Sequence, residues 1–566
     1  MSEDNNTAKH DKERLVFLRA FRGSKKPRVP NPSALLWRRA RQVTQIVALL
    51  AFLALLLATR GGEFPSIGNA AMRPLLFRRP PGIEQIELGP TRIVALPHVF
   101  FHLDPLAMLA SAIAARRWVD GLALALVTVG LTLALGRVWC GWLCPLGTTL
   151  DWIRPRKSPQ VSLSERWRTI KYVVLIALLG AAVARNLTLL AFDPISILTR
   201  GLGSFVLPGL NQVTVGLERW LYNVEPLQGA IDWFEASVRT SLFPADVWRW
   251  WNLVPGLLLV GIIALNWVAK RFWCRYLCPL GGLLGLISRV VILRRIVGVD
   301  ACRHCQRCSR ACPAGTIQLE TFESDPAECT VCLDCLPECP TPGGQTFASV
   351  WGRPRGTPLL APAQEYDPGR RQMLAALGGG LVAAVAYPLV PPALRRDQYL
   401  IRPPGAQSEA FLSQCIRCGE CLKVCPTSGL QPALWESGLD GFWTPTLISR
   451  LGYCDYSCHS CGQVCPTGAI PNLALEVKRQ QVLGKAQINR DHCWPWAENT
   501  PCIVCEEMCP LAPKAVELEV IEVTDDAGQT IALQRPHVIE DRCIGCGICE
   551  FKCPAEGEAA IRVSNA

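Results

Sequence analysis

Charged side chains, histidine and nucleotide-binding motifs are all scarce in this chain. Asp, Glu, Lys and Arg make up 19% of its 566 residues, whereas hydrophobic residues make up 50%, which excludes an ordinary soluble protein. There are seven histidines and no Cys-x-x-Cys-His, so covalently bound haem is excluded. No Gly-x-Gly-x-x-Gly or Walker sequence occurs, so nucleotide and flavin cofactors have no support.

No cysteine stands alone, because all 28 belong to closely spaced motifs. Two Cys-x3-Cys-Pro pairs, Cys140 with Cys144 and Cys274 with Cys278, each end an apolar run. The other 24 form six runs of four that end in Cys-Pro: Cys302, Cys305, Cys308 and Cys312; Cys329, Cys332, Cys335 and Cys339; Cys415, Cys418, Cys421 and Cys425; Cys454, Cys458, Cys461 and Cys465; Cys493, Cys502, Cys505 and Cys509; Cys543, Cys546, Cys549 and Cys553. Disulfides need no Cys-Pro ending and structural zinc uses separated Cys-x2-Cys pairs, so the pattern favours iron–sulfur clusters.

Each run can supply the four thiolates of one cluster, which predicts six [4Fe–4S] clusters. In two-cluster ferredoxins, three thiolates come from one turn and the fourth comes from the Cys-Pro of another run. For the first two runs this predicts one cluster on Cys302, Cys305, Cys308 and Cys339, and another on Cys329, Cys332, Cys335 and Cys312. A chain of this kind transfers single electrons.

Five apolar segments could span a bilayer, which takes about 20 residues. They lie at residues 42–59, 119–139, 171–192, 252–270 and 372–391. Arg185 and Asn186 interrupt the third segment. Segment 97–114 is predicted to be a half-buried or re-entrant helix on the outer side.

Basic loops orient these segments, because Lys/Arg-rich flanks stay in the cytoplasm. The tail at residues 1–41 carries 11 Lys/Arg against 4 acids, which indicates topology rather than nucleic-acid binding. The 151–171 loop is also basic, although five Lys/Arg at 60–97 argue against this orientation. We expect a cytoplasmic N-terminus, with both Cys-x3-Cys-Pro pairs at the cytoplasmic ends of the second and fourth spans.

An internal repeat relates the two halves of the apolar region. Asp104-Pro-Leu precedes a Trp-Cys140-Gly-Trp-Leu-Cys144-Pro-Leu-Gly sequence, and Asp193-Pro-Ile precedes Trp-Cys274-Arg-Tyr-Leu-Cys278-Pro-Leu-Gly. Two like halves suggest a pseudo-two-fold bundle in which four sulfurs converge on a seventh, shared cluster. Copper binding and reversible disulfides are the competing uses of these four thiols.

Four polar residues near the bilayer are candidates for a quinone site: His98, His102, Asp104 and Asp193. A histidine or carboxylate at the bilayer edge could accept protons from a quinol. The alternative is structural, because Asp-Pro is a common helix start with Asp as the N-cap. Neither histidine has a partner on another span, so a membrane haem is not supported.

The predicted fold is a membrane α-helical bundle of about five spans with an internal pseudo-repeat, together with two α+β ferredoxin-like modules. The four-span membrane domain covers residues 42–288, and a cytoplasmic two-cluster ferredoxin follows at 289–351. After a linker at 352–369, Arg370-Arg371 begins a fifth apolar helix at 370–393 that resembles a twin-arginine export signal. An ordinary fifth span gives the same topology, with a four-cluster module at 394–566 outside.

The chain resembles two ferredoxin families fused into one polypeptide. Residues 38–350 resemble the NapH/MauN-type membrane ferredoxins in their spans and in the two Trp-Cys-x-x-Leu-Cys-Pro-Leu-Gly sequences. Residues 366–566 resemble the NapG/MauM-type exported ferredoxins, as in Cys415-Ile-Arg-Cys-Gly-Glu-Cys and Cys465-Pro-Thr-Gly-Ala-Ile. The four runs that begin at Cys415, Cys454, Cys493 and Cys543 are numbered one to four here and below for the module at 394–566. The resemblance implies that runs one and four share two clusters, and that runs two and three share the other two. The implied ligand sets are Cys415, Cys418, Cys421 and Cys553; Cys543, Cys546, Cys549 and Cys425; Cys454, Cys458, Cys461 and Cys509; Cys493, Cys502, Cys505 and Cys465.

The resemblance also implies a function in the bacterial cytoplasmic membrane, within a larger complex. We expect an electron-transfer subunit that links the quinone pool, or a cytoplasmic donor, to an extracytoplasmic cytochrome or oxidoreductase subunit. The alternative is an electron-supplying maturation or regulatory factor for a periplasmic metalloenzyme or quinone-cofactor enzyme.

Overall fold

The computed structural model describes most of the chain outside the amino-terminal tail and the predicted linker. The described residues are 32–58, 98–153, 165–239, 249–298, 301–319, 322–341, 344–349, 378, 400–407, 409–434, 436–524 and 530–565. Most of the basic tail, the 352–369 linker and nearly all of the predicted fifth helix at 370–393 therefore lie outside the described residues.

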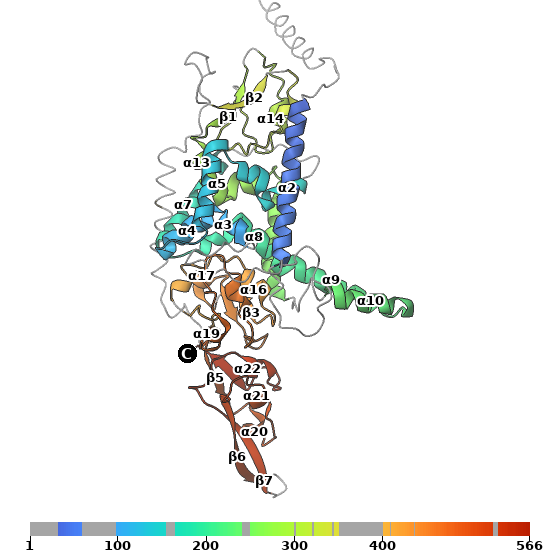
Figure 1. The fold of residues 1–566 in the computed structure, drawn as a ribbon, viewed down its shortest axis with the longest axis vertical. Coiled ribbons are helices and arrows are strands. Elements are labelled where there is room, and N and C mark those ends of the chain that lie inside the picture. Colours follow the sequence, from blue (N-terminus) through green and yellow to red (C-terminus); the bar gives the residue numbers. More distant parts are fainter. Residues whose placement is uncertain are drawn as a thin grey trace, which may run out of the picture.

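The molecule is elongated and has three parts along its long axis (Figure 1). A helical domain lies in the middle, a small module with the β1–β2 sheet lies at one end, and the carboxy-terminal module extends from the other end (Figure 1). We call these parts the helical domain, the inner module and the outer module. The two ferredoxin-like modules are thus separated by the helical domain.

The helical domain is built from apolar helices rich in Leu, Ala, Val and Ile. Their bounds are α2 (Pro32–Ala58), α3 (Val99–His102), α4 (Pro105–Ala115), α5 (Leu122–Leu135), α6 (Pro145–Trp152), α7 (Ile170–Val183), α8 (Pro194–Arg200), α9 (Leu207–Leu221), α10 (Gln228–Phe234), α12 (Leu253–Ala264) and α13 (Pro279–Ser288). Between them lie π-helical segments, which include η3 (Trp139–Leu143), η6 (Gly201–Val206) and η11 (Trp273–Leu277). The 3-10 segments include η5 (Thr188–Phe192), η9 (Trp250–Asn252) and η10 (Leu265–Trp267).

Two described segments, 34–57 and 250–267, are long and apolar enough to cross a membrane. The predicted spans at 119–139 and 171–192 contain the shorter helices α5 and α7, each of 14 residues. Gly136 at φ 84° follows α5, and Arg185 at φ 62° comes just after α7. Left-handed residues end an α-helix, so the expected five-span bundle is not reproduced in the described part of the chain.

The sequence repeat folds into a structural repeat. Asp104 and Asp193 are the N-caps of α4 and α8, each followed by Pro at the first helical position. Cys144 and Cys278 each follow a π-helical turn, η3 or η11, and each is the N-cap of the next helix, α6 or α13. π-Helical turns within helices occur frequently at functional sites.

The two modules have few regular elements. In the inner module, β1 (Leu293–Val297) pairs antiparallel with β2 (Gln345–Ser349), beside α14 (Arg307–Ala311). In the outer module, the antiparallel pairs are β3 (Leu430–Pro432) with β4 (Pro445–Leu447), β5 (Lys485–Ile488) with β8 (Ile561–Ser564), and β6 (Val516–Thr524) with β7 (Thr530–Val538). Its short helices include α16 (Glu420–Val424), α17 (Gly438–Gly441), α18 (Ser460–Gln463), α19 (Leu475–Arg479), α20 (Trp494–Ala497), α21 (Val504–Glu507) and α22 (Ile548–Lys552).

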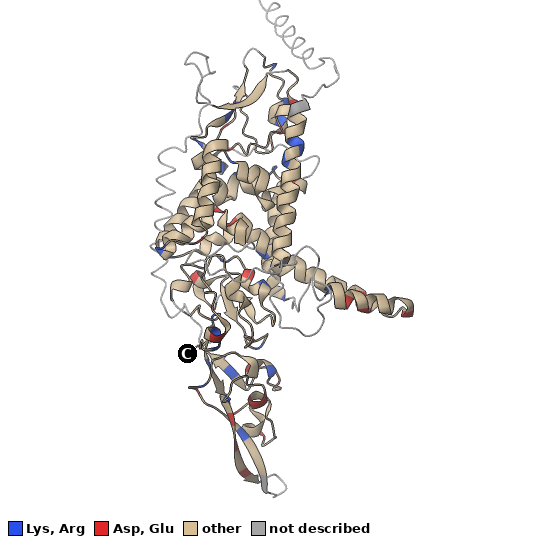
Figure 2. Ribbon diagram, viewed as in Figure 1, with Lys and Arg blue, Asp and Glu red and all other residues tan. Residues whose placement is uncertain are grey.

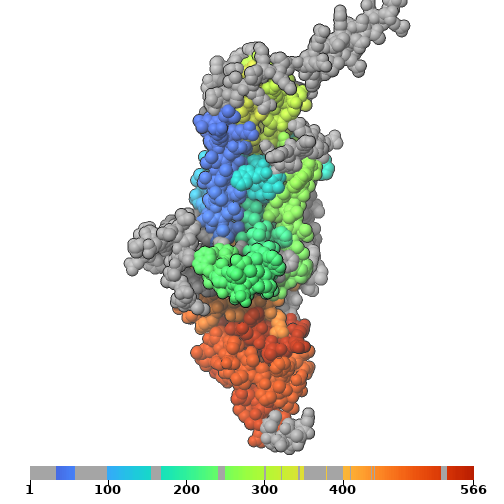
Figure 3. All heavy atoms as spheres, turned by 90° about the vertical axis from the view of Figure 1, so that its right-hand side faces the viewer, coloured from blue at the N-terminus to red at the C-terminus, as the bar shows by residue number. Residues whose placement is uncertain are grey.

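Helices α9 and α10 project sideways from the helical domain, close to where the outer module begins (Figure 1). In the space-filling view this green segment points toward the viewer and lies at that boundary (Figure 3). Large apolar side chains on it are exposed, among them Leu210, Val213, Leu217 and Trp220. Their spacing of three or four residues places them on one side of α9.

Candidate functional site

The four regular Cys-x2-Cys-x2-Cys turns share an unusual backbone conformation. In each of them, the residues directly before and after the second cysteine have positive φ. These residues are His304 and Gln306, Val331 and Leu333, Arg417 and Gly419, and Gly545 and Gly547. Left-handed φ is costly for a β-branched residue such as Val331, whose φ is 50°. Turns of this kind point successive N–H groups inward and so form a concavity suited to an anion.

In the inner module, one cavity is lined by four cysteines from two runs. Cys312 from the first run joins the first three cysteines of the second run, Cys329, Cys332 and Cys335. These are the four residues expected to share a cluster. For the other inner group, Thr341 donates a hydrogen bond to the carbonyl of Ala301 at 2.8 Å, which brings the Cys339 segment to the segment of Cys302.

In the outer module the structure corrects the expected ligand sets. One cavity is lined by Cys415, Cys418, Cys421 and Cys465, and another by Cys454, Cys458, Cys461 and Cys425. Runs one and two therefore exchange their fourth cysteines with each other. The expected exchanges of run one with run four, and of run two with run three, are wrong.

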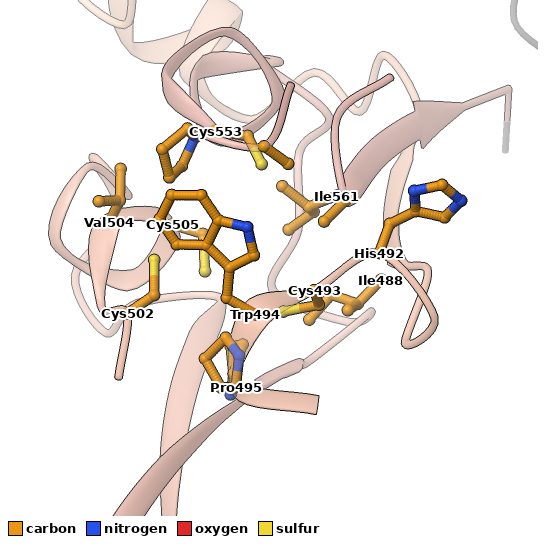
Figure 4. A pocket seen from close by; sticks show the side chains of 14 residues that line it. Ile488, His492, Cys493, Trp494, Pro495, Cys502, Val504, Cys505, Cys553 and Ile561 are labelled. Carbon is orange, nitrogen blue, oxygen red and sulfur yellow. The ribbon is translucent and has the colours of Figure 1, made fainter. Parts of the chain in front are cut away.

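Runs three and four exchange their fourth cysteines in the same way. A third outer cavity is lined by Cys493, Cys502, Cys505 and Cys553, and Figure 4 shows these cysteines around it with Trp494 and Pro495. The remaining group consists of Cys543, Cys546 and Cys549 from run four and Cys509 from run three. Cys546 interacts electrostatically with Cys543 and Cys509, and Cys549 interacts with Cys543 and Cys546. The long Cys493–Cys502 segment contains the short helix α20 (Trp494–Ala497), and the cysteines at both of its ends line this cavity of Cys493, Cys502, Cys505 and Cys553.

The chemistry of these cavities fits iron–sulfur clusters. Backbone N–H groups donate to cysteine sulfurs, as from Ile470 to Cys465 at 3.3 Å and from Ala515 to Cys509 at 3.4 Å. Burial raises the pKa of the Cys454 thiol to about 12, so this sulfur keeps its proton at neutral pH unless a metal replaces it. Among the described residues, no three His, Cys, Asp or Glu side chains are close enough to bind one metal ion. Cluster cysteines each bind a different iron, so they need not meet at one ion.

The helical domain brings its own four cysteines together. Cys140, Cys144, Cys274 and Cys278 lie close enough to interact electrostatically, and each is buried or half-buried. All are free thiols, so the disulfide alternative is not formed here. We call this group the central cysteines.

Two buried arginines flank the central cysteines. The guanidinium of Arg137 faces Cys140 and Cys278, and Arg271 donates to the carbonyl oxygen of Cys140 at 3.3 Å. A cluster on four thiolates carries negative charge, which these cations would stabilise. Neither arginine was predicted as a site residue from the sequence, although each stands three residues before the first cysteine of its pair.

The cysteine groups follow one another along the molecule. Arg271 interacts with Cys274 of the central cysteines and with Cys332 of the inner module. On the other side, Cys418 belongs to the same apolar core as Cys140 and Cys144. Within the outer module, the N–H of Cys454 donates to the carbonyl of Cys546 at 2.8 Å, which links the first pair of groups to the second.

A buried ion-pair network fixes the inner module to the helical domain. Glu328 pairs with Lys171 at 2.5 Å and with Arg137 at 3.4 Å, and all three side chains are at most 5% exposed. Arg41 on α2 pairs with Asp334 at 2.9 Å. Gly141 allows a close backbone approach, since a Cβ there would lie 2.1 Å from the Thr330 carbonyl oxygen.

Two quinone-site candidates, His98 and His102, instead lie against the outer module. His102 Nε2 lies 2.9 Å from the Pro466 carbonyl oxygen, and His98 hydrogen-bonds the backbone of Val464. The two imidazoles therefore hold the residues on either side of Cys465. Lys423 adds a bond to the Leu56 carbonyl at 2.9 Å, so the outer module packs tightly on α2 and α3.

The other two candidates, Asp104 and Asp193, are completely buried between α4 and α8. Asp104 accepts from the N–H groups of Leu106 and Ala107, as the N-cap interpretation predicted. Asp193 accepts from two N–H groups of α8 at 3.0 Å. Neither carboxyl group contacts solvent directly, so a proton would reach the pair only through the protein.

Several parts of the chain match iron–sulfur families. Residues 118–162 with 251–300, and separately residues 536–556, match families described as "4Fe-4S binding domain". Residues 321–426 and 414–469 match families described as "4Fe-4S dicluster domain". The 414–469 match agrees with the exchange between runs one and two. The 321–426 match joins two runs that the structure places in different modules.

Curated relatives resemble about a third of the chain. The methylamine utilization ferredoxin-type protein MauM of Methylorubrum extorquens is 33% identical over 213 residues, which is 36% of this chain and 91% of MauM. The ferredoxin-type protein NapG of Escherichia coli K12 is 34% identical over 202 residues, 34% of this chain and 85% of NapG. MauM of Paracoccus denitrificans is 34% identical over 200 residues, 35% of this chain and 84% of that protein. No solved structure matches the chain.

Proposed function

This chain belongs to the NapG and MauM family of ferredoxin-type proteins, and we propose that it conducts electrons across a bacterial cytoplasmic membrane. It is a multi-cluster 4Fe-4S electron-transfer protein. The observation that carries the proposal is the arrangement of its cysteines: groups lie at both ends of the helical domain, and the central cysteines lie between them.

The residues fit seven cluster sites. Six would be held by the four-cysteine groups of the inner and outer modules, and the seventh by the central cysteines, which lie within residues matched to a 4Fe-4S binding domain. When bound, the clusters would supply one-electron transfer. The protein would hold them in a fixed order, with Arg271 and Arg137 between the central cysteines and the inner module.

The surface of the helical domain supports a location in the bilayer. Large apolar side chains face outward on α2, α5 and α12, including Val47, Leu126 and Leu257. Charged residues are sparse along the helices of this domain and gather at the end of α2 near the inner module (Figure 2). An exposed apolar surface of this extent suits lipid better than water. Two segments have the length to cross.

The two ends of the cysteine series are suited to different partners. Cys305 of the inner module is exposed, which would allow a cytoplasmic donor to approach. At the far end, Cys502 and Cys505 are half-buried beside the exposed Ile503, where an extracytoplasmic cytochrome or oxidoreductase could dock. Electrons from a membrane quinol would enter at the helical domain.

Topology and iron content test this proposal together. Reporter fusions after residues 160 and 320 should report cytoplasmic locations, and fusions after residues 200 and 450 should report the outside. Anaerobically purified protein should contain about 24 iron atoms from the two modules and about four more from the central cysteines. A cytoplasmic signal at residue 450 would refute transmembrane conduction, and an iron content near six would refute the cluster assignment.

A further inference from the structure

The buried carboxyl groups of Asp104 and Asp193 meet where the two halves of the repeat come together. One oxygen of each group accepts the capping N–H groups of its own helix. The other oxygens, Asp104 Oδ2 and Asp193 Oδ1, have no N–H or O–H donor among the described residues. The two side chains nevertheless lie within hydrogen-bonding reach of each other.

This contact requires a proton. An ionised carboxylate only accepts hydrogen bonds, so two of them in contact would repel each other. Two buried carboxyl groups at one site do not both ionise, and such pairs share a proton. The charged groups that face the pair are few: Asp104 faces Asp193, and Asp193 faces Asp104 and Arg200.

We propose that Asp104 and Asp193 form a proton-binding site that shares one proton and takes up a second when the adjacent cysteine cavity gains negative charge. The cavity is the one lined by Cys415, Cys418 and their partners. Only the uptake of the second proton rests on the proposed function; the shared proton does not.

Arg200 connects the carboxyl pair to this cavity. It stands at the end of α8, the helix that Asp193 caps, and it is 4% exposed. Its guanidinium interacts electrostatically both with Asp193 and with Cys415 and Cys418, and it lies over the Trp443 ring at 5.5 Å. A buried cation between two anionic sites makes the charge of each site depend on the other.

The coupled step takes up one electron and one proton. A cluster held by Cys415, Cys418 and their partners would accept one electron from a chemical reductant such as dithionite, and one proton from solvent would then bind to the carboxyl pair. On oxidation the electron leaves and the proton returns to solvent. No bond other than the O–H bond is formed or broken at the pair.

The shared proton is tested by stability in detergent, without any need for activity. In Asp104→Asn, the amide oxygen can keep the cap and the NH2 group can donate to Asp193 in place of the shared proton. We expect this variant to melt within a few degrees of the wild type at neutral pH, whereas Asp104→Ala, which lacks cap and donor, melts clearly lower. A large stabilisation by Asp104→Asn would mean that both groups are ionised in the wild type, and would overturn the proposal.

Proton uptake is tested by infrared difference spectroscopy between dithionite-reduced and oxidised protein. We expect the wild type to gain a carboxylic-acid C=O band that shifts in heavy water and is absent from Asp104→Asn and Asp193→Asn. The exposed Asp232→Asn is the matched control and should keep the band. A band that survives in the double Asp104→Asn/Asp193→Asn variant, or normal cluster signals with no band in the wild type, would overturn the coupling. Loss of cluster signals in every protein would instead count against the proposed function.

Discussion

Replacing Glu328 by Gln should loosen the inner module from the helical domain. The carboxylate lies between Lys171 and Arg137, and its removal leaves two cations that are at most 1% exposed without their ionic partner. Breaking a buried pair from one side costs about 3–5 kcal/mol of unfolding free energy. The Gln side chain keeps one acceptor oxygen, so we expect the lower part of this range.

The measurement is the urea midpoint of the visible cluster absorbance in detergent-solubilised protein. Glu558→Gln is the control, because its ion pair with Arg562 is exposed and should contribute less than about 1 kcal/mol. The double variant Lys171→Met/Glu328→Leu should recover part of the loss, since the buried Lys171 cation is then no longer left without its ionic partner. Equal midpoints for Glu328→Gln and Glu558→Gln would refute the buried network.

The pKa of Glu328 predicts how the stability of the protein depends on pH. Burial alone would raise the pKa of Glu328, but the charges of Lys171 and Arg137 outweigh it and hold this pKa below its ordinary value. A lowered pKa in the folded state means that the stabilisation is fully present above the ordinary pKa of about 4.3. It is lost as pH falls through the folded-state pKa, and Glu328→Gln should lack this acid-dependent loss.

Three further predictions concern the outer ligand sets, the central cysteines and the contact at Gly141. Cys465→Ser should remove the cluster nearest the helical domain and leave the outermost one intact, as seen by electron paramagnetic resonance; loss of the outermost cluster would contradict the exchange between runs one and two. Cys144→Ser and Cys278→Ser should each remove the same four iron atoms, and the loss of two different species would refute the shared central site. Gly141→Ala should destabilise the docked inner module, whereas Gly130→Ala, where a Cβ meets nothing within 4 Å, should be nearly neutral or slightly stabilising; equal effects of the two would argue against the close approach at Gly141.

Much of the chemistry could be predicted from the sequence because cysteine spacing is local. Three ligands within seven residues define a turn, and the structure forms that turn in all four regular runs. The resemblance to the NapG and MauM ferredoxins was confirmed by relatives over a third of the chain. The inner cavity also contains the four cysteines that were expected to meet there.

The fourth ligand of each outer group could not be predicted from spacing. It comes from another run, so its identity depends on which turns pack together in three dimensions. The resemblance implied exchanges between runs one and four and between runs two and three, whereas the structure pairs neighbouring runs, as with Cys465 and Cys425. Sequence separation does not decide the exchange, because runs two and three are as close in the chain as runs one and two.

The helical domain shows a second limit of sequence reasoning. Hydropathy indicated where apolar helices lie, but left-handed residues such as Arg185 shorten them. The role of Arg137 and Arg271 was missed because the repeat was read from the tryptophan onward. Extending it by two residues gives Arg-x-Trp-Cys-x-x-Leu-Cys-Pro-Leu-Gly in both halves, which already places a cation beside each pair of thiols.

The most direct test of transmembrane conduction uses proteoliposomes under anaerobic conditions. Protein is inserted in one orientation, a membrane-impermeant oxidant such as ferricyanide is trapped inside, and dithionite is added outside. We expect the trapped oxidant to be reduced by the wild type and much more slowly when Cys144 and Cys278 are both replaced by Ser. If fully loaded wild-type protein leaves the trapped oxidant unchanged, the cysteine groups do not form a path across the membrane.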